Sequence, residues 1–197
     1  IIDYGAGNIF SVKNALDYLG VENKLTADKN EICAADEIIL PGVGAFPWAM
    51  KMLRDSGLVD TIREEARKKP FLGICLGMQL IFDKGYEFEE TDGLRLIGGK
   101  VEKIDRKDMI IPHMGWNELE INRDCPILKG LPEHPYVYFV HSYAAVCDEA
   151  NVSVYCDYGG KITALVHDGA YVYGAQFHPE KSGEVGLQML RNFAELA

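Results

Sequence analysis

A cysteine between two glycines, at the end of an apolar run, constrains this chain more than any other feature. The segment 71–79, with the sequence FLGICLGMQ, predicts a buried strand, a sharp turn and the start of a helix. That order is typical of a nucleophile elbow, in which the reactive side chain stands at the corner. Gly73 and Gly77 allow a tight turn where a Cβ would collide. Cys75 would then lie at a helix N-terminus, where unpaired N–H groups favour negative charge.

A free cysteine at a strand end is more often a packed structural residue than a nucleophile. A cysteine that is only packed needs no glycine on both sides, so the flanking glycines favour the nucleophile. The N–H group of Leu76, the residue after Cys75, is a candidate oxyanion donor because it opens the predicted helix.

A candidate general base lies far downstream, in the segment 175–180 with the sequence AQFHPE. Pro179 ends the preceding strand, because proline cannot donate to a ladder. It also spaces His178 and Glu180 so that their side chains can point the same way. An imidazole beside a carboxylate, brought to a thiol, is a nucleophile, base and orienting group. Alone, His-Pro-Glu is more often a plain turn, but with the elbow it predicts a triad of Cys75, His178 and Glu180.

These two motifs, GICLGMQ at 73–79 and QFHPE at 176–180, resemble those of the class I (triad) glutamine amidotransferases. Further segments narrow the resemblance to the glutaminase subunits of imidazole glycerol phosphate synthase, an enzyme of histidine biosynthesis. These segments are DYGAGN at 3–8, PGVGAF at 41–46, PHMGWN at 112–117, FVHSY at 139–143 and EKS at 180–182. The resemblance runs along essentially the whole chain.

The resemblance implies an α/β fold of the flavodoxin-like, three-layer type, with residues 1–197 forming one glutamine amidotransferase domain. Strand and helix patterns alternate up to the elbow, which favours a mostly parallel central sheet. After Leu96 short strand patterns follow one another, which predicts an antiparallel or mixed extension. The apolar patterns predict early strands at 1–4, 21–25 and 37–40, and helices at 9–19, 46–53, 58–69 and 183–196. Because the first strand pattern is already under way at Ile1, we expect a few residues to precede it.

Composition limits the partners and the setting. A net charge of −10 argues against a nucleic-acid partner, and no apolar run approaches the length of a membrane helix. Five cysteines without a C-x-x-C pair fit neither a disulfide framework nor a zinc site, so a reducing cytoplasm is expected. We expect no cofactor, and the spacing offers no metal site among the histidines His113, His134, His141 and His167.

The resemblance also implies the substrate and the reaction. Cys75 would attack the side-chain amide of L-glutamine, with His178 transferring protons and Glu180 orienting the imidazole. The oxyanion donors would be the N–H groups of Leu76 and of the loop at Val43, although a plain Pro-Gly turn is the alternative there. Contacts to the amino-acid end of glutamine are implied for Gly44, Gln79, Glu87, Ser142 and Tyr143. For Gln79, a polar residue on the solvent side of a helix is the alternative.

Glu87 is the least direct of these assignments, because the family's loop sequence differs from the residues that precede Glu87 here. A partner is implied as well, since ammonia released into water is protonated at neutral pH and lost as a nucleophile. The resemblance implies a heterodimer with a (β/α)₈-barrel cyclase subunit. Its contacts would include Trp116, Asn117, Tyr138 and Lys181. Core packing is the alternative for the tryptophan and the tyrosine.

Three other functions stay open. The chain could serve another amidotransferase, for anthranilate, pyridoxal phosphate or GMP synthesis, although the segment 112–117 argues against this. It could be a stand-alone cysteine hydrolase acting on γ-glutamyl compounds, which would be active without a partner. A non-enzymatic binding module that kept the fold is the third, and an intact Cys75, His178 and Glu180 argues against it.

Overall fold

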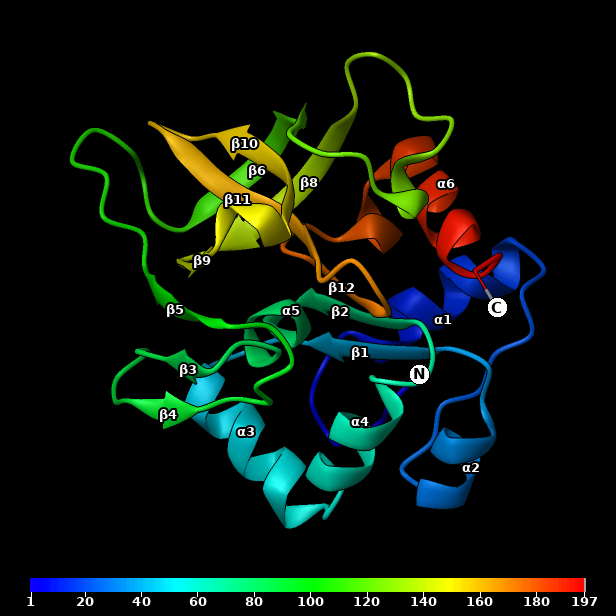
Figure 1. Ribbon diagram of the computed structural model, residues 1–197. Helices are drawn as coiled ribbons and strands as arrows, with labels where there is room; N and C mark the ends of the chain where they lie inside the picture. The colour runs from blue at the N-terminus through cyan, green and yellow to red at the C-terminus, as the bar shows by residue number, and fades with distance from the viewer. Residues whose placement is uncertain (197) are drawn as a thin grey trace.

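A six-stranded sheet runs through the middle of the molecule, and the computed structural model describes it within residues 1–196 (Figure 1). Its strand order is β1-β2-β12-β11-β10-β7. The first three strands are parallel and the other three are antiparallel. Their bounds are β1 (Ile38–Gly42), β2 (Phe71–Cys75), β12 (Val172–Ala175), β11 (Lys161–His167), β10 (Val152–Asp157) and β7 (Glu120–Ile121).

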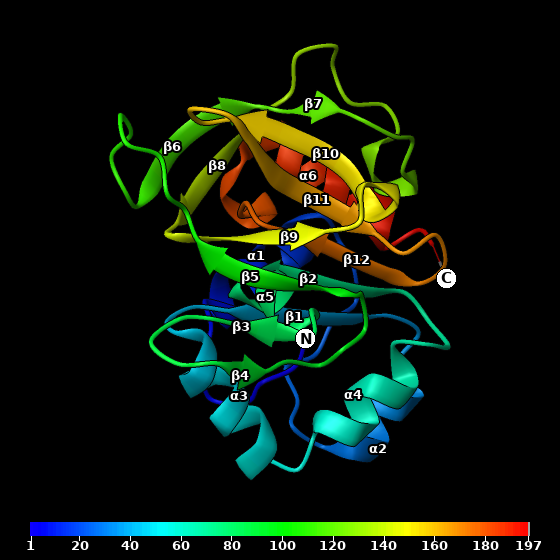
Figure 2. The same cartoon turned by 60° about the vertical axis from the view of Figure 1, so that its left-hand side comes forward.

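Two smaller sheets lie beside the central one (Figure 2). The first has the order β4-β3-β5-β9, with bounds β4 (Thr91–Asp92), β3 (Lys84–Gly85), β5 (Gly99–Lys103) and β9 (Tyr143–Cys147). The second is an antiparallel ribbon of β6 (His113–Glu118) and β8 (Tyr136–His141). The strand patterns expected after Leu96 are therefore confirmed as a mixed extension, which the two short strands β3 and β4 join.

Helices cover both faces of the central sheet, which gives the three layers that the resemblance implied. One face packs on α1 (Ile9–Tyr18) and α6 (Gly183–Phe193), and the other on α2 (Lys29–Ala34), α3 (Phe46–Asp55) and α4 (Val59–Glu65). Side chains alternate along a strand, so Ile39 joins the first core while Ile38 and Leu40 join the second. Three short 3₁₀ helices complete the elements: η1 (Pro126–Leu128), η2 (Glu149–Asn151) and η3 (Pro179–Lys181).

The elbow has the predicted form, because β2 leads directly into the short helix α5 (Leu76–Leu80). The positive φ falls on Cys75 itself, at 55°, and not on either glycine. A Cβ on Gly77 would lie 1.8 Å from the carbonyl oxygen of Leu40, and one on Gly73 would lie 2.6 Å from the carbonyl oxygen of Gly77. The glycines are therefore needed because α5 lies directly against β1 and β2.

The predicted strands at 1–4 and 21–25 are wrong. Neither segment forms a strand, and the pairing here is an isolated bridge between Ile2 and Thr26, one residue beyond the second segment. The chain turns after Asp3, whose carboxylate accepts the Gly5 N–H at 3.1 Å, so the ladder ends after one pair. The third strand continues through Pro41 instead of stopping there, since β1 lies at the edge of the sheet, where proline is tolerated.

The four predicted helices are present, and three are shorter than predicted, the first of them by one residue at Tyr18. The helix predicted at 58–69 ends at Glu65 and continues as turns, and the helix predicted at 183–196 ends at Phe193. In the part of the chain that the structure describes, no helix combines the length and the apolar character needed to cross a membrane.

Candidate active site

The thiol and the imidazole meet because their strands are neighbours. β2 and β12 run parallel, with Ile74 opposite Ala175, so both chains leave the sheet at the same edge. Cys75 is the last residue of β2, and His178 follows the end of β12 by three residues. Sites in sheets of this kind form at the carboxyl ends of the strands.

The imidazole of His178 is held from both sides. Its Nδ1 lies 2.8 Å from Oε1 of Glu180, and both side chains are almost completely buried. Burial lowers the pKa of His178, but hydrogen bonds to Cys75 and Glu180 outweigh burial and raise this pKa to about 9. The ring therefore keeps a proton at neutral pH, which makes it a proton donor for a leaving group beside the sulfur.

A cavity of about 380 Å³ opens above the sulfur. Every residue predicted to hold the oxyanion or the substrate lines it, together with Cys75 and His178. These lining residues are Val43, Gly44, Leu76, Gln79, Glu87, Ser142 and Tyr143. The volume lies within the usual range for small-ligand sites, about 300–1,000 Å³.

The two candidate oxyanion donors come from adjacent strand ends. Gly42 is paired with Cys75 in the parallel ladder, so the loop at Val43 and Gly44 begins beside the elbow. Gly44 has a φ of +99°, which favours glycine, and Val43 is 46% exposed. Leu76 is the first residue of α5, where backbone N–H groups have no partner within the helix.

Gln79 and Glu87 are fixed in place by hydrogen bonds. Gln79 is buried, and its Nε2 donates to the carbonyl of Tyr143 and to Oε1 of Gln176, both at 3.0 Å. The solvent-facing alternative for Gln79 is therefore wrong. Oε2 of Glu87 accepts the N–H of Phe46 at 2.8 Å, which holds this carboxylate at the N-terminus of α3.

Three further residues contact or surround the sulfur, and the sequence assigned none of them a role there, although each lies in a quoted motif. Gln176 is fully buried, and its Nε2 lies 3.9 Å from Sγ of Cys75. The thiol itself is 3.9 Å from the carbonyl of Val140, and His141 lines the cavity. A signal for Gln176 existed, because a residue two positions before His178 in an extended segment lies on the same side. We call residues 140–143 the pocket wall.

Comparison with known proteins decides the family. A family model described as glutamine amidotransferase class-I matches residues 1–196. The chain belongs to this family. It is 50% identical over 194 residues to a protein of Bacillus cereus (strain G9842) named imidazole glycerol phosphate synthase subunit HisH, covering 98% of this chain and 92% of that one. A protein of the same name from Listeria monocytogenes serotype 4a (strain HCC23) is 48% identical over 198 residues, covering 100% and 94%.

Solved structures agree on the fold. A crystal structure of a glutamine amidotransferase matches 99% of this chain and 96% of its own with a TM-score of 0.76, at 23% identity. That likeness bears on the fold alone. It confirms the predicted α/β fold of the class I glutamine amidotransferases.

The residues that the resemblance to the amidotransferases placed at a partner interface lie near the triad. Trp116 is 54% exposed, and its ring meets that of Tyr138 edge-on at 6.1 Å. Tyr138 in turn lies 6.5 Å from the ring of His178, and Lys181 is exposed in η3. Asn117 differs from these three, because its half-buried side chain is hydrogen-bonded inward.

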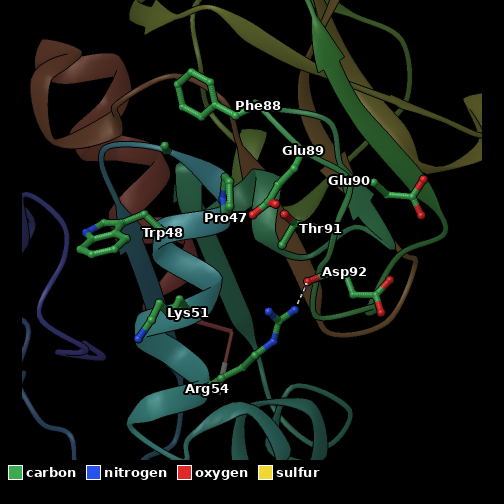
Figure 3. Close-up of a pocket in the computed structure, with 10 residues that line it drawn as sticks. Pro47, Trp48, Lys51, Arg54, Phe88, Glu89, Glu90, Thr91 and Asp92 are labelled. Carbon is green, nitrogen blue, oxygen red and sulfur yellow. Dashed lines mark hydrogen bonds between the residues drawn. The ribbon is translucent and has the colours of Figure 1, made fainter.

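A second cavity of this amidotransferase, of about 1,010 Å³, lies between α3 and the segment that follows Glu87 (Figure 3). Trp48 and Phe88 stand at its rim, and Nη2 of Arg54 donates to the carbonyl of Asp92 at 2.7 Å. Its other charged groups are mostly paired, as in the ion pairs Lys51–Asp55, Lys84–Glu90 and Arg95–Asp92. It contains neither the thiol nor the imidazole, so the smaller cavity is the candidate active site.

Metal ligands do not gather at either cavity. Within residues 1–196, no group of three or more histidine, cysteine, aspartate and glutamate side chains is arranged to hold a metal ion. All five cysteines are free thiols.

Proposed function

We propose that this chain is the glutaminase subunit of an imidazole glycerol phosphate synthase. It hydrolyses L-glutamine to glutamate and ammonia and delivers the ammonia to a cyclase subunit. The observation that carries the proposal is the buried imidazole of His178, which is hydrogen-bonded to Glu180 and lines the same cavity as Cys75. The relatives named HisH, which are 50% and 48% identical along nearly the whole chain, support the choice of this enzyme.

The first half of the reaction forms a thioester. Cys75 gives its thiol proton to His178, its sulfur attacks the carbon of the glutamine side-chain amide, and the C–N bond breaks. His178 gives its proton to the departing nitrogen, so ammonia leaves as the neutral base. Glu180 holds the ring in the orientation that this transfer needs. The N–H groups of Leu76 and Val43 stabilise the oxyanion, an effect worth about 10²–10³ in rate for a single donor.

The second half of the reaction hydrolyses the thioester and regenerates the free enzyme. His178 takes a proton from water, the hydroxide attacks the thioester carbon, and the carbon–sulfur bond breaks to release glutamate. The amino-acid end of the substrate would contact Gly44, Glu87 and the pocket wall, with Gln79 holding the wall from behind. No cofactor enters either half.

The released ammonia needs a protected route. We place the partner, a (β/α)₈-barrel cyclase, on the surface that carries Trp116, Tyr138 and Lys181, beside His178. Exposed aromatic side chains of this kind are typical interface anchors. With the ammonia the cyclase would make imidazole glycerol phosphate and an aminoimidazole carboxamide ribonucleotide. We place this heterodimer in the cytoplasm, which suits five unpaired cysteines.

The deciding experiment mixes the chain with a cyclase subunit and measures glutamate release, with Cys75→Ala as control. We expect turnover that needs Cys75 and copurification of the two subunits. Copurification with a different synthase would favour an amidotransferase for anthranilate, pyridoxal phosphate or GMP. Steady turnover of γ-glutamyl compounds without any partner would favour the stand-alone hydrolase. No labelling of Cys75 by an electrophilic glutamine analogue would contradict catalysis altogether.

A further inference from the structure

Two buried histidines that the proposed reaction does not use are joined in a row. Nδ1 of His113 lies 3.0 Å from Nε2 of His141. At the inner end, Nδ1 of His141 lies 2.8 Å from the carbonyl oxygen of Tyr143. At the outer end, Nε2 of His113 lies 2.7 Å from Oδ1 of Asn117. The row therefore spans from the ribbon of β6 and β8 to the pocket wall.

Its inner end leads on to the sulfur. The carbonyl of Tyr143 accepts a second hydrogen bond, from Gln79 at 3.0 Å. Gln79 also donates to Gln176, whose Nε2 lies 3.9 Å from Sγ of Cys75. The imidazole of His141 thus holds a carbonyl to which the side chains beneath the nucleophile are attached.

When both rings are neutral, the row has one N–H group fewer than its three contacts need. At the inner end the main-chain carbonyl of Tyr143 can only accept. Asn117 donates from Nδ2 to the carbonyl of Asp157 at 3.1 Å, so its Oδ1 must face His113 as an acceptor. The three contacts along the row then need N–H groups on three of the four ring nitrogens. Two neutral imidazoles carry only two.

The surroundings oppose the extra proton. Burial lowers the pKa of His113, despite its contact with Asn117. Burial also lowers the pKa of His141 to about 4, and the charge of His178 acts in the same direction. The other titratable groups nearby are Tyr143, Tyr158 and Asp157; the hydroxyl of Tyr158 is engaged with a carbonyl and the carboxylate of Asp157 with a backbone N–H.

When both rings are neutral, one of the three hydrogen bonds must therefore break, and burial determines which one. The ring of His113 is completely buried, stacked between Phe139 at 4.8 Å and Tyr158 at 3.9 Å. A buried donor or acceptor left without a partner costs about 1–3 kcal/mol. Asn117 and Tyr143 are both half-exposed, but the carbonyl of Tyr143 is also held by buried Gln79. Asn117 can therefore most easily exchange its contact for water or turn its amide. The outer contact yields at the lowest cost.

We propose that His113 and His141 form a proton-linked positioning pair between the ribbon and the pocket wall. The pair holds the carbonyl of Tyr143 in both charge states, and it fixes the amide of Asn117 only when it carries one proton more than two neutral rings. In the neutral pair each ring donates inward from Nδ1, and the lone pair left on Nε2 of His113 can accept only from a donor, such as Nδ2 of Asn117. The orientation of this amide therefore reports the charge of the pair.

The first test is ¹⁵N NMR of the histidine rings and of the side-chain amide of Asn117, recorded on the full chain across a pH titration. Five imidazoles in the chain make assignment by single substitutions practical. We expect the pair to pass from two ring N–H groups to three as the pH falls, with the Asn117 signals shifting over the same pH range. Rings that gain the proton while Asn117 stays unmoved, or a pair that never gains it before unfolding, would overturn the proposal.

Two substitutions at Asn117 sharpen this test. Asn117→Asp places a carboxylate beside Nε2 of His113, which should raise the pKa of the pair by about 1–3 units relative to wild type. Asn117→Leu removes the acceptor and should lower that pKa. Equal pKa values in Asn117→Asp and Asn117→Leu would contradict the role of Asn117.

A second measurement addresses the pocket wall and rests on the proposed function. His141→Leu removes the donor to Tyr143, so we expect the KM for glutamine to rise about tenfold with a smaller change in kcat. His141→Asn keeps an N–H near the place of Nδ1 and should lie closer to wild type. Equal effects of the two variants would overturn the positioning role. If the wild-type chain with its cyclase showed no glutaminase activity, the proposed function would fail while the NMR test kept its force.

Discussion

The two sides of the active site are built by different means. The nucleophile side, formed by β1, β2 and α5, is fixed by close approach of main-chain atoms, as Gly77 against Leu40 shows. The opposite side, formed by the pocket wall and its supports, is fixed by hydrogen bonds of buried polar side chains such as Gln176 and His141, with Gln79 of α5 reaching across to it. Steric contact tolerates almost no change, whereas a hydrogen-bonded network yields one contact at a time. Substitutions on the two sides should therefore differ in effect: those against steric contacts should disrupt the packing, and those in the network should remove single hydrogen bonds.

The largest effect is expected at Gly77. Gly77→Ala places a Cβ 1.8 Å from the carbonyl oxygen of Leu40, so β1 and α5 must separate. We expect the free energy of unfolding to fall by more than about 4 kcal/mol, measured by urea denaturation. Gly98→Ala is the matched control, because its Cβ would have a nearest neighbour at 3.8 Å. Equal stability of the two variants would show that the nucleophile side is not sterically fixed.

Next in size is the loss of the carboxylate that orients the imidazole. Glu180→Gln keeps the shape of the side chain but not its charge, so His178 loses the anion at 2.8 Å that sets its tautomer. We expect kcat for glutamine hydrolysis to fall about 10²–10⁴-fold, with the fold intact. Glu184→Gln, at an exposed position in α6, serves as control and should retain wild-type turnover. A Glu180→Gln enzyme with normal kcat would contradict the proposed triad.

A smaller effect links pH to stability through His178. Its pKa is raised from 6.5 to about 9, so the stability it contributes is complete below 6.5 and is lost as the pH rises through about 9. The free energy of unfolding should fall over this range by on the order of 1–3 kcal/mol. In Cys75→Ala one hydrogen-bond partner is gone, so the pKa of His178, followed by NMR, should drop and the stability should vary less with pH. An unchanged pKa of His178 in Cys75→Ala would contradict an interaction between the imidazole and the thiol.

The smallest effect has the opposite sign. The buried hydroxyl of Tyr4 has no hydrogen-bond partner among residues 1–196, and it lies 3.0 Å from where a Cβ of Gly42 would stand. Tyr4→Phe should raise the free energy of unfolding by about 1 kcal/mol, because it removes an unsatisfied buried group. Tyr158→Phe is the comparison, since that hydroxyl donates to the carbonyl of Ile110 at 2.7 Å and its loss should not stabilise. A destabilised Tyr4→Phe would reveal a contact on the nucleophile side that steric packing does not explain.

What the sequence predicts follows the same division. The elbow was predictable because a run of nine residues contains the strand, the turn and both glycines. His178 and Glu180 were predictable because one proline sets their spacing. The segments near the bridge of Ile2 to Thr26 were predicted as two strands. An apolar pattern does not indicate how many residues of an edge segment are paired with a neighbouring strand.

The hydrogen bonds behind the pocket wall were not predictable in this way. They join Gln79 to Tyr143 and Gln176 to Cys75, pairs that are 64 and 101 positions apart in the chain. No local pattern marks two buried polar side chains as partners, since each alone is typical of a solvated surface. The inward orientation of Asn117 was missed for the same reason, because one of its partners, the carbonyl of Asp157, lies 40 positions away in β10.

The place of β12 in the sheet has a consequence for the chain while it is being synthesised. β12 fills the position between β2 and β11, and the base and the acid follow it directly. A nascent polypeptide that has passed the elbow but not yet this strand lacks both the middle of its sheet and the partner of its thiol. We therefore expect the candidate nucleophile to gain its candidate base only after β12 has joined the sheet.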